Sequence, residues 1–275
     1  MTAITLLTDH PAWTYDTDGT ASRLVCSGTG SVWYTRWTGA TLTLQPVIDR
    51  SPVPAPRLTP SGDLPPCAPT ELVKGLAPPD AVLRLPNPSL WDAITSALLR
   101  RIIRAEQARA LYHRWCLTYG PRHDTPSGPV SAVPCPRTVL DLHEQAYDAI
   151  GARLHRKALT AAAAAYLHRS EEWSQLDPED LVKALQEVSG IGPWTAAAAA
   201  ADFTGDYSVY PHSDLAVRTW ARQAAPGFTW PEDERAFAAL WHRWAPDRPQ
   251  LHALTTFTLA WGIHARTEHD KDSTP

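Results

Sequence analysis

The sequence predicts a mainly α-helical protein with a small β-containing layer at its amino-terminal end. From Ser89 onward, apolar residues recur at helical spacing. Residues 1–45 instead contain short runs of β-branched and aromatic residues separated by glycines, which are typical of strands. The stretch 188–196 carries two glycines between two helical patterns and indicates a tight hairpin. We therefore expect a β-containing region over residues 1–75, including a proline-rich connection, and a helical domain over residues 76–275.

The predicted strands cover residues 23–26, 31–37 and 41–44, where apolar and β-branched side chains are concentrated. Residues 46–79 follow with ten prolines, too many for regular structure throughout. We expect a long, semi-rigid connection there.

The predicted helices begin at Ser89, a residue that caps helices well. A second helix should run over 104–119 and end at Gly120-Pro121, before a proline-rich loop over 121–136. Asp177-Pro178 has the composition of a helix start, with a capping residue followed by proline at the first helical position. The other expected helices cover residues 137–150, 155–169, 195–201, 213–224, 232–245 and 250–262. The alanines at 196–201 either allow another backbone to approach closely or simply favour helix formation.

Composition narrows the class of protein. The chain has 275 residues, a net charge of −4 and no apolar run long enough to span a bilayer. Its first residues lack the features of a signal peptide, so we expect a cytoplasmic protein. Four cysteines occur without a C-x-x-C pair, which argues against a zinc ribbon or an iron–sulfur cluster and predicts free thiols.

Positive charge is unevenly distributed. Between Arg84 and Arg122 there are seven arginines against Asp92 and Glu106, which gives 7 − 2 = +5. This segment is either a solvated helix face or a surface that contacts a nucleic-acid backbone.

The hairpin has a clear chemical use. Gly190 and Gly192 supply backbone angles that other residues resist, and they leave no side chain between the amides and a ligand. The following helix begins with amides that lack intrahelical partners, and its dipole favours an anion. The hairpin is therefore suited to hold a DNA phosphate.

The pattern Leu-x-x-Val-Ser-Gly-Ile-Gly-x-x-Thr-Ala at 185–196, followed by Tyr-Pro-His-Ser-Asp at 210–214, resembles the helix–hairpin–helix DNA glycosylase superfamily. It looks most like the bacterial 3-methyladenine DNA glycosylase II branch, over about residues 84–262. The resemblance implies a two-lobed helical body with a cleft between the lobes. It also implies DNA-backbone contacts at Gly190, Ile191, Gly192 and Thr195. The resemblance further implies that a monovalent cation, Na⁺ or K⁺, binds to the backbone carbonyls of Leu185, Val188 and Gly190. It implies no other cofactor.

The family's catalytic aspartate falls on Asp214, which lies 22 positions after Gly192. Breaking an N-glycosidic bond builds positive charge on the sugar. A carboxylate can stabilise that charge and can orient or deprotonate water. The alternative for Asp214 is an N-cap of the next helix, and one residue can serve both purposes.

Members that also cleave the strand carry a lysine nucleophile where this chain has Trp194. An indole cannot form a Schiff base, so the resemblance implies a monofunctional enzyme that leaves an abasic site. In the alkyl-base branch this tryptophan lines the pocket for the flipped base. The alternative for Trp194 is a core position between helices. Tyr210, His212 and Trp91 are weaker pocket candidates, and a core position remains the alternative, above all for Trp91.

The family's intercalating wedge falls on Ile102, with Ile103 next to it. An apolar side chain there fills the hole that a flipped base leaves. Many members carry glutamine just before the wedge, whereas this chain has Arg101. An ordinary core position is the alternative for Ile102.

We therefore expect a monomeric DNA N-glycosylase of base excision repair without lyase activity, which acts on a damaged, alkylated or otherwise modified base in duplex DNA and works at the nucleoid. One rival is a glycosylase for an oxidised base or a specialised adduct. The other is a non-catalytic protein that binds DNA through the hairpin and senses modified bases.

Overall fold

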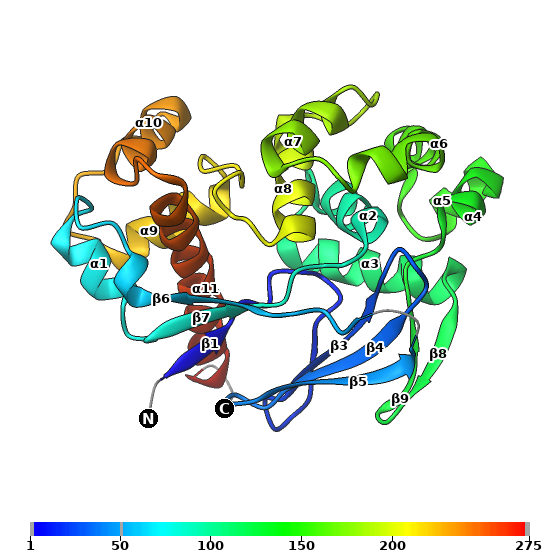
Figure 1. Ribbon diagram of the computed structural model, residues 1–275, viewed down its shortest axis with the longest axis horizontal. Helices are drawn as coiled ribbons and strands as arrows, with labels where there is room; N and C mark the ends of the chain where they lie inside the picture. Colours follow the sequence, from blue (N-terminus) through cyan, green and yellow to red (C-terminus); the bar gives the residue numbers. More distant parts are fainter. Residues whose placement is uncertain (1–2, 50–51, 273–275) are drawn as a thin grey trace. The chain divides into compact units, whose positions relative to one another are not determined.

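The computed structural model describes residues 3–49 and 52–272, and it confirms a mainly helical protein with a smaller β-containing part (Figure 1). The chain forms two compact units, and neither is a continuous stretch of sequence. Unit 1 comprises Met1–Asp9, Ala55–Leu85 and Asp206–Pro275, and unit 2 comprises His10–Pro54 and Pro86–Gly205. Residues on both sides of position 75 thus contribute to each unit. Among the described helices, none is long and apolar enough to cross a bilayer.

Unit 2 begins with a four-stranded antiparallel sheet in the order β2-β3-β4-β5. The strands are β2 (Thr14–Tyr15), β3 (Ala21–Cys26), β4 (Val32–Trp37) and β5 (Leu42–Ile48). A separate hairpin of β8 (Arg122–Thr125) and β9 (Gly128–Ser131) packs near this sheet. Leu24, Val32 and Tyr34 of the sheet form an apolar cluster with Ala132, which directly follows the hairpin. The three strands predicted between residues 23 and 44 are therefore confirmed.

Two segments predicted to be irregular contain regular elements: the loop predicted over 121–136 is wrong in this respect, and the connection predicted over 46–79 is irregular only in part. The proline-rich stretch 121–136 contains the β8–β9 hairpin. The stretch 46–79 contains the end of β5, strand β6 (Arg57–Pro60) and helix α1 (Thr70–Leu76). Prolines are compatible with these elements because Pro46 lies on an edge strand and Pro69 directly precedes the first helical residue.

The helices of unit 2 follow the predicted order. Ser89 caps α2, since its Oγ accepts a hydrogen bond from the Asp92 amide at 3.1 Å. Asp177 caps α7 in the same way through the Asp180 amide at 3.0 Å. The expected helix 137–150 is two short helices, α4 and α5. The full set is α2 (Leu90–Arg100), α3 (Ala105–Tyr119), α4 (Pro136–Asp141), α5 (Glu144–Ala149), α6 (Arg156–Trp173), α7 (Pro178–Gln186) and α8 (Pro193–Thr204).

The alanine-rich helix α8 is the centre of the helical part of unit 2. All six alanines from 196 to 201 are buried, and α8 packs against α2 and α7. Side chains this small let neighbouring helices approach closely. The alanine run therefore lies in the core, as the close-approach interpretation requires.

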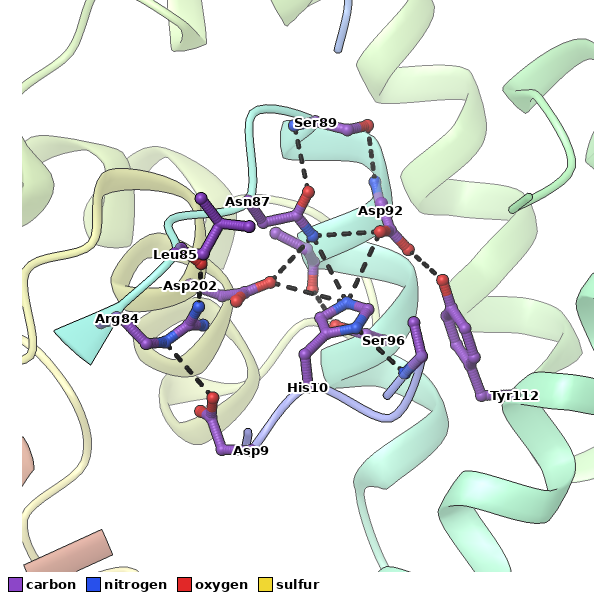
Figure 2. A network of polar contacts seen from close by, with 12 residues as sticks. Asp9, His10, Arg84, Leu85, Asn87, Ser89, Asp92, Ser96, Tyr112 and Asp202 are labelled. Atoms are coloured by element: carbon purple, nitrogen blue, oxygen red, sulfur yellow. Dashed lines mark hydrogen bonds and ion pairs between the residues drawn. The ribbon is translucent and has the colours of Figure 1, made fainter. Parts of the chain in front are cut away.

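A buried polar network ties the start of unit 2 to helices α2, α3 and α8 (Figure 2). Asn87 Nδ2 donates hydrogen bonds to the carboxylates of Asp92 at 3.1 Å and Asp202 at 3.0 Å. His10 Nε2 lies 3.5 Å and 3.7 Å from the same two groups, and the Tyr112 hydroxyl donates to Asp92 at 2.7 Å. Burial raises the pKa of Asp92 to about 6, although the bond from Tyr112 opposes this shift. The network is enclosed in the core, where such groups need partners.

Unit 1 has a three-stranded sheet in the order β1-β7-β6, in which β1 (Ile4–Leu6) runs parallel and β6 antiparallel to β7 (Ala81–Arg84). Its helices besides α1 are α9 (Leu215–Ala224), α10 (Glu234–Trp244) and α11 (Arg248–Asp272). Helix α11 contacts β7, α1 and α9, and Figure 1 shows it beside the sheet. An aromatic cluster lies in this unit, where Trp230, Trp241 and Trp244 pack with Phe228 and Phe237.

Candidate nucleic-acid site

The glycine hairpin joins α7 to α8 as the sequence predicts. Gly190 has a φ of +87°, and a Cβ at this position would lie 2.8 Å from the Cβ of Ala158 in α6. Gly192 is the N-cap of α8, with an ordinary φ of −85° and open space around its Cα. The first glycine is therefore required by both backbone angle and packing, whereas the second keeps the start of α8 uncovered.

Two of the hairpin residues cannot contact a ligand through their side chains. Ile191 and Thr195 are 5% and 4% exposed, and both point into the core of unit 2. Gly190 and Gly192 are exposed. Contact with a phosphate would therefore use backbone amides at the amino end of α8, where the helix dipole is favourable for an anion.

The predicted wedge lies in the turn between α2 and α3. Ile102 is 77% exposed, and its φ of +66° makes it the one non-glycine residue with positive φ in the described part of the chain. A β-branched residue in this region is a genuine outlier, and such strain persists where the surrounding structure holds it. Ile103 is half-buried. The core alternative for Ile102 does not agree with this exposure.

Arg101 connects the wedge turn to the hairpin. Its Nη1 donates a hydrogen bond to the Gly190 carbonyl oxygen at 2.7 Å, across 89 positions of sequence. Its charge also acts on His155, whose pKa is lowered by burial first and by Arg101 second. The sequence placed Arg101 among the DNA-contacting residues beside the wedge, as a departure from the glutamine of many superfamily members. It did not indicate this bond, because no local pattern links the two segments.

Trp194 lies in the first turn of α8 and is half-buried. The guanidinium of Arg100 lies 5.9 Å from the centre of its ring, within the range of a cation–π contact. Trp91 is different: it is 4% exposed, its Nε1 donates to the Pro134 carbonyl at 2.8 Å, and its ring packs near Tyr166. Trp91 thus lies in the core of unit 2, which agrees with the alternative stated for it and not with a place in the base pocket.

Asp214 belongs to unit 1 and caps α9. Its Oδ2 accepts hydrogen bonds from the Ala216 amide at 3.2 Å and from the Tyr210 hydroxyl at 3.3 Å. Tyr210 is 2% exposed, and its ring stacks on Tyr207 at 5.4 Å. Tyr210 therefore holds the Asp214 carboxylate in place. The sequence could have indicated this contact, because Tyr210 lies four residues before Asp214 and Asp214 is the N-cap of α9.

His212 lies two residues before Asp214 and is buried. Its ring meets that of His242 edge-on at 4.7 Å. Burial, together with the nearby His242, lowers the pKa of His212 to about 4. Its Nε2 has no hydrogen-bond partner among the described residues. His212 is thus a neutral imidazole at physiological pH.

The arginines between 84 and 122 do not form a single surface. Arg84 is buried in unit 1, where its Nε donates to the Tyr207 hydroxyl at 2.9 Å and lies 3.3 Å from the Asp9 carboxylate. In unit 2, Arg109 and Arg114 donate to backbone carbonyls. The positive charge beside the wedge therefore comes from a smaller group that includes Arg100, Arg101 and Arg104.

The predicted site residues fall into two groups. Unit 2 brings together the hairpin, Trp194 and the wedge turn with Arg101, Ile102 and Ile103. Unit 1 brings together Asp214, Tyr210 and His212. All four cysteines of the chain are free thiols, as predicted.

Solved structures with the same fold are found among DNA repair enzymes. A 3-methyladenine DNA glycosylase from Archaeoglobus fulgidus matches with a TM-score of 0.70 and 14% identity, over 95% of this chain and 92% of that one. An 8-oxoguanine glycosylase/lyase from Clostridium acetobutylicum, in complex with double-stranded DNA, matches with a TM-score of 0.69 and 12% identity, over 96% and 90%. No protein-family model and no curated protein sequence matches the chain.

The chain therefore has the fold of the helix–hairpin–helix DNA glycosylases. Because the identities are so low, the activity has to be argued from the residues.

Proposed function

We propose that this protein is a monofunctional DNA glycosylase that flips a damaged base out of duplex DNA and hydrolyses its N-glycosidic bond. The observation that carries this proposal is Ile102, an exposed apolar side chain held at a strained backbone angle and bonded through its neighbour to the hairpin. A solvent-exposed isoleucine adds no buried apolar area to the core, whereas base flipping requires an apolar plug for the vacated stack.

The hairpin supplies the grip on the duplex. Backbone amides at the amino end of α8 and the positive end of its dipole suit a phosphate, without reading sequence. Arg100, Arg101 and Arg104 add positive charge in the neighbouring turn, although the chain as a whole carries −4. Binding should therefore weaken as salt concentration rises.

Asp214 is the proposed catalytic residue. Its carboxylate is held by the Ala216 amide and the Tyr210 hydroxyl, so its orientation is fixed before substrate arrives. A preorganised negative charge stabilises the oxocarbenium-like sugar of the transition state and can orient the attacking water. Capping of α9 and catalysis use the same carboxylate.

The proposal of a monofunctional enzyme rests on Trp194. Strand cleavage in this superfamily proceeds through a lysine amine at this position, and an indole has no nucleophilic nitrogen for a Schiff base. The product should be an intact strand with an abasic site.

The damaged base has two candidate classes. The resemblance to the 3-methyladenine branch favours an alkylated and often cationic base that stacks on Trp194. The guanidinium of Arg100 beside the same ring favours the second candidate, a neutral base such as an oxidised one, because like charges repel at short range. A panel of duplexes with alkylated, deaminated and oxidised bases, scored for abasic sites, separates the two.

The decisive variant is Asp214→Asn, which should retain duplex binding and lose base release by at least about a hundredfold. Asp233→Asn is the matched control, since Asp233 caps α10 through the Ala236 amide at 2.8 Å in the same unit. Tyr210→Phe should lower the rate several-fold and leave binding unchanged. Full activity of Asp214→Asn would refute the mechanism, and a strand break without alkali would contradict the monofunctional assignment. Specific binding without base release on the whole panel would favour the non-catalytic alternative.

A further inference from the structure

Arg101 makes a contact in unit 2 that the resemblance does not explain. The resemblance implies a monovalent cation on the backbone carbonyls of Leu185, Val188 and Gly190. In this chain the Gly190 oxygen already accepts a hydrogen bond from the Arg101 guanidinium at 2.7 Å. The other two oxygens accept from the chain itself: Leu185 from the Val188 amide at 3.1 Å, and Val188 from the Ile191 amide at 3.0 Å.

These carbonyls do not fit an additional cation. A carbonyl oxygen has two lone pairs, so one hydrogen bond alone would not exclude a metal ion. An ion on the Gly190 oxygen would, however, lie close to the permanent positive charge of Arg101, and charges of the same sign repel strongly at such separations. The Nε of Arg101 is buried, while the residue as a whole is half-buried and its bond to Gly190 lies at the surface of the unit.

The bond between Arg101 and Gly190 also links the wedge turn to the hairpin, two parts that the proposed function uses together. Arg101 directly precedes Ile102, whose backbone angle is strained and whose side chain is exposed. Its guanidinium lies on the hairpin oxygen, so the wedge and the phosphate grip are held in one arrangement. Charge-assisted hydrogen bonds of this kind are about twice as strong as neutral ones.

We infer that the Arg101 guanidinium takes the place of a hairpin cation and positions the Ile102 wedge on the hairpin, so that DNA binding needs no particular monovalent ion. Arg101 is a positioning residue that acts through Gly190 and Ile102. This inference rests on the proposed function as far as the wedge is concerned. The other part, that the hairpin needs no cation, concerns the hairpin alone and does not depend on the proposed function.

The test compares binding to a duplex with a tetrahydrofuran abasic analogue in sodium, potassium and choline chloride at one ionic strength. Wild-type affinity should agree within about twofold among the three salts. Arg101→Gln should weaken binding about tenfold, since it loses a charged hydrogen bond. Arg101→Lys should recover part of this loss, and Arg104→Gln, which removes the same charge from the same turn, should weaken binding about threefold or less.

A second readout separates positioning from folding. A 2-aminopurine base beside the abasic site reports insertion of the wedge, and its fluorescence change should be lost in Arg101→Gln while Arg104→Gln retains it. The inference is overturned if wild type binds tenfold more weakly in choline chloride than in the other salts, or if Arg101→Gln behaves like Arg104→Gln.

Failure of the proposed function looks different. In that case wild type would not prefer the abasic duplex over an undamaged one. The unfolding midpoint of the protein alone, measured in the three salts, would still decide the cation question: equal midpoints support the inference, and a midpoint raised by sodium or potassium overturns it.

Discussion

Replacing Gly190 with alanine should destabilise unit 2, whereas the same replacement at Gly192 should leave its stability nearly unchanged. The two glycines are separated by a single residue in the hairpin and would gain the same methyl group. They differ in backbone angle, +87° against −85°, and in surroundings. A Cβ on Gly190 would lie 2.8 Å from the Cβ of Ala158, whereas none of the described atoms lies within 4 Å of a Cβ on Gly192.

The expected magnitude follows from these two differences. An alanine in the left-handed region costs about 1–2 kcal/mol. Forcing an extra methyl group against α6 adds about 1–3 kcal/mol, for a total of about 2–5 kcal/mol. For a domain of this size the melting temperature should fall by about 4–20 °C. At Gly192, the weaker capping by alanine and the reduced freedom of the unfolded chain oppose each other, and each is worth about 1 kcal/mol or less.

Thermal unfolding followed by circular dichroism measures both variants, and urea titration gives the free energies. DNA affinity should be measured alongside, because either methyl group can obstruct a phosphate without changing stability. Equal melting temperatures for Gly190→Ala and Gly192→Ala would show that the backbone angle and the contact with Ala158 do not constrain the hairpin as argued.

Two further perturbations test the buried polar groups. Asn87→Leu leaves the Asp92 and Asp202 carboxylates without their shared donor and should lower the free energy of unfolding by at least about 2 kcal/mol, which urea titration measures; an unchanged midpoint would contradict the role of the network. Burial and the nearby His242 lower the pKa of His212 to about 4, below the ordinary value of 6.5, so the unfolded chain binds a proton more readily than the folded one. Stability should therefore fall as pH drops from about 6.5 to about 4, and His212→Gln should reduce this slope by up to about 1.4 kcal/mol per pH unit. Identical slopes in the variant and the wild type would mean that the ring is not kept neutral.

Helix starts were the most predictable feature of this sequence. Ser89 and Asp177 cap helices through side chains that bond an amide three residues later, an interaction contained within four consecutive residues. The hairpin was predictable for a similar reason, since the positive φ of Gly190 is a local requirement. Such features depend on short-range geometry, which sequence patterns describe well.

The strands and the α1 helix among the prolines were missed for a physical reason as well. Proline removes a donor from a β-ladder, but Pro46 lies on edge strand β5, where the unused side of the strand needs no partner within the sheet. Pro129 lies in the two-stranded β8–β9 hairpin, where each strand is also an edge. Counting prolines therefore overestimates irregular structure wherever a sheet has edges.

Within the site, the sequence could indicate contacts between residues close in the chain, but it could not indicate contacts between distant segments. Tyr210 and Asp214 are four residues apart before a helix start, so their hydrogen bond agrees with the predicted grouping. The bond between Arg101 and Gly190 joins segments 89 positions apart, and no periodicity connects them. The exposure of Ile102 likewise depends on how α2 ends, which hydrophobic spacing does not specify.

The division of the chain into interleaved segments has a consequence for its biosynthesis. Every residue of unit 2 has been synthesised once the ribosome passes Gly205, so this unit can fold while translation continues. Strands β1, β6 and β7 and helix α1 are made earlier, but β7 and α1 pack against α11, and α1 also packs against α9, and both of these helices are synthesised after Gly205. The apolar faces of β7 and α1 therefore stay exposed until α11 has been synthesised. Nascent chains stalled between residues 85 and 206 should be the ones that aggregate or recruit chaperones.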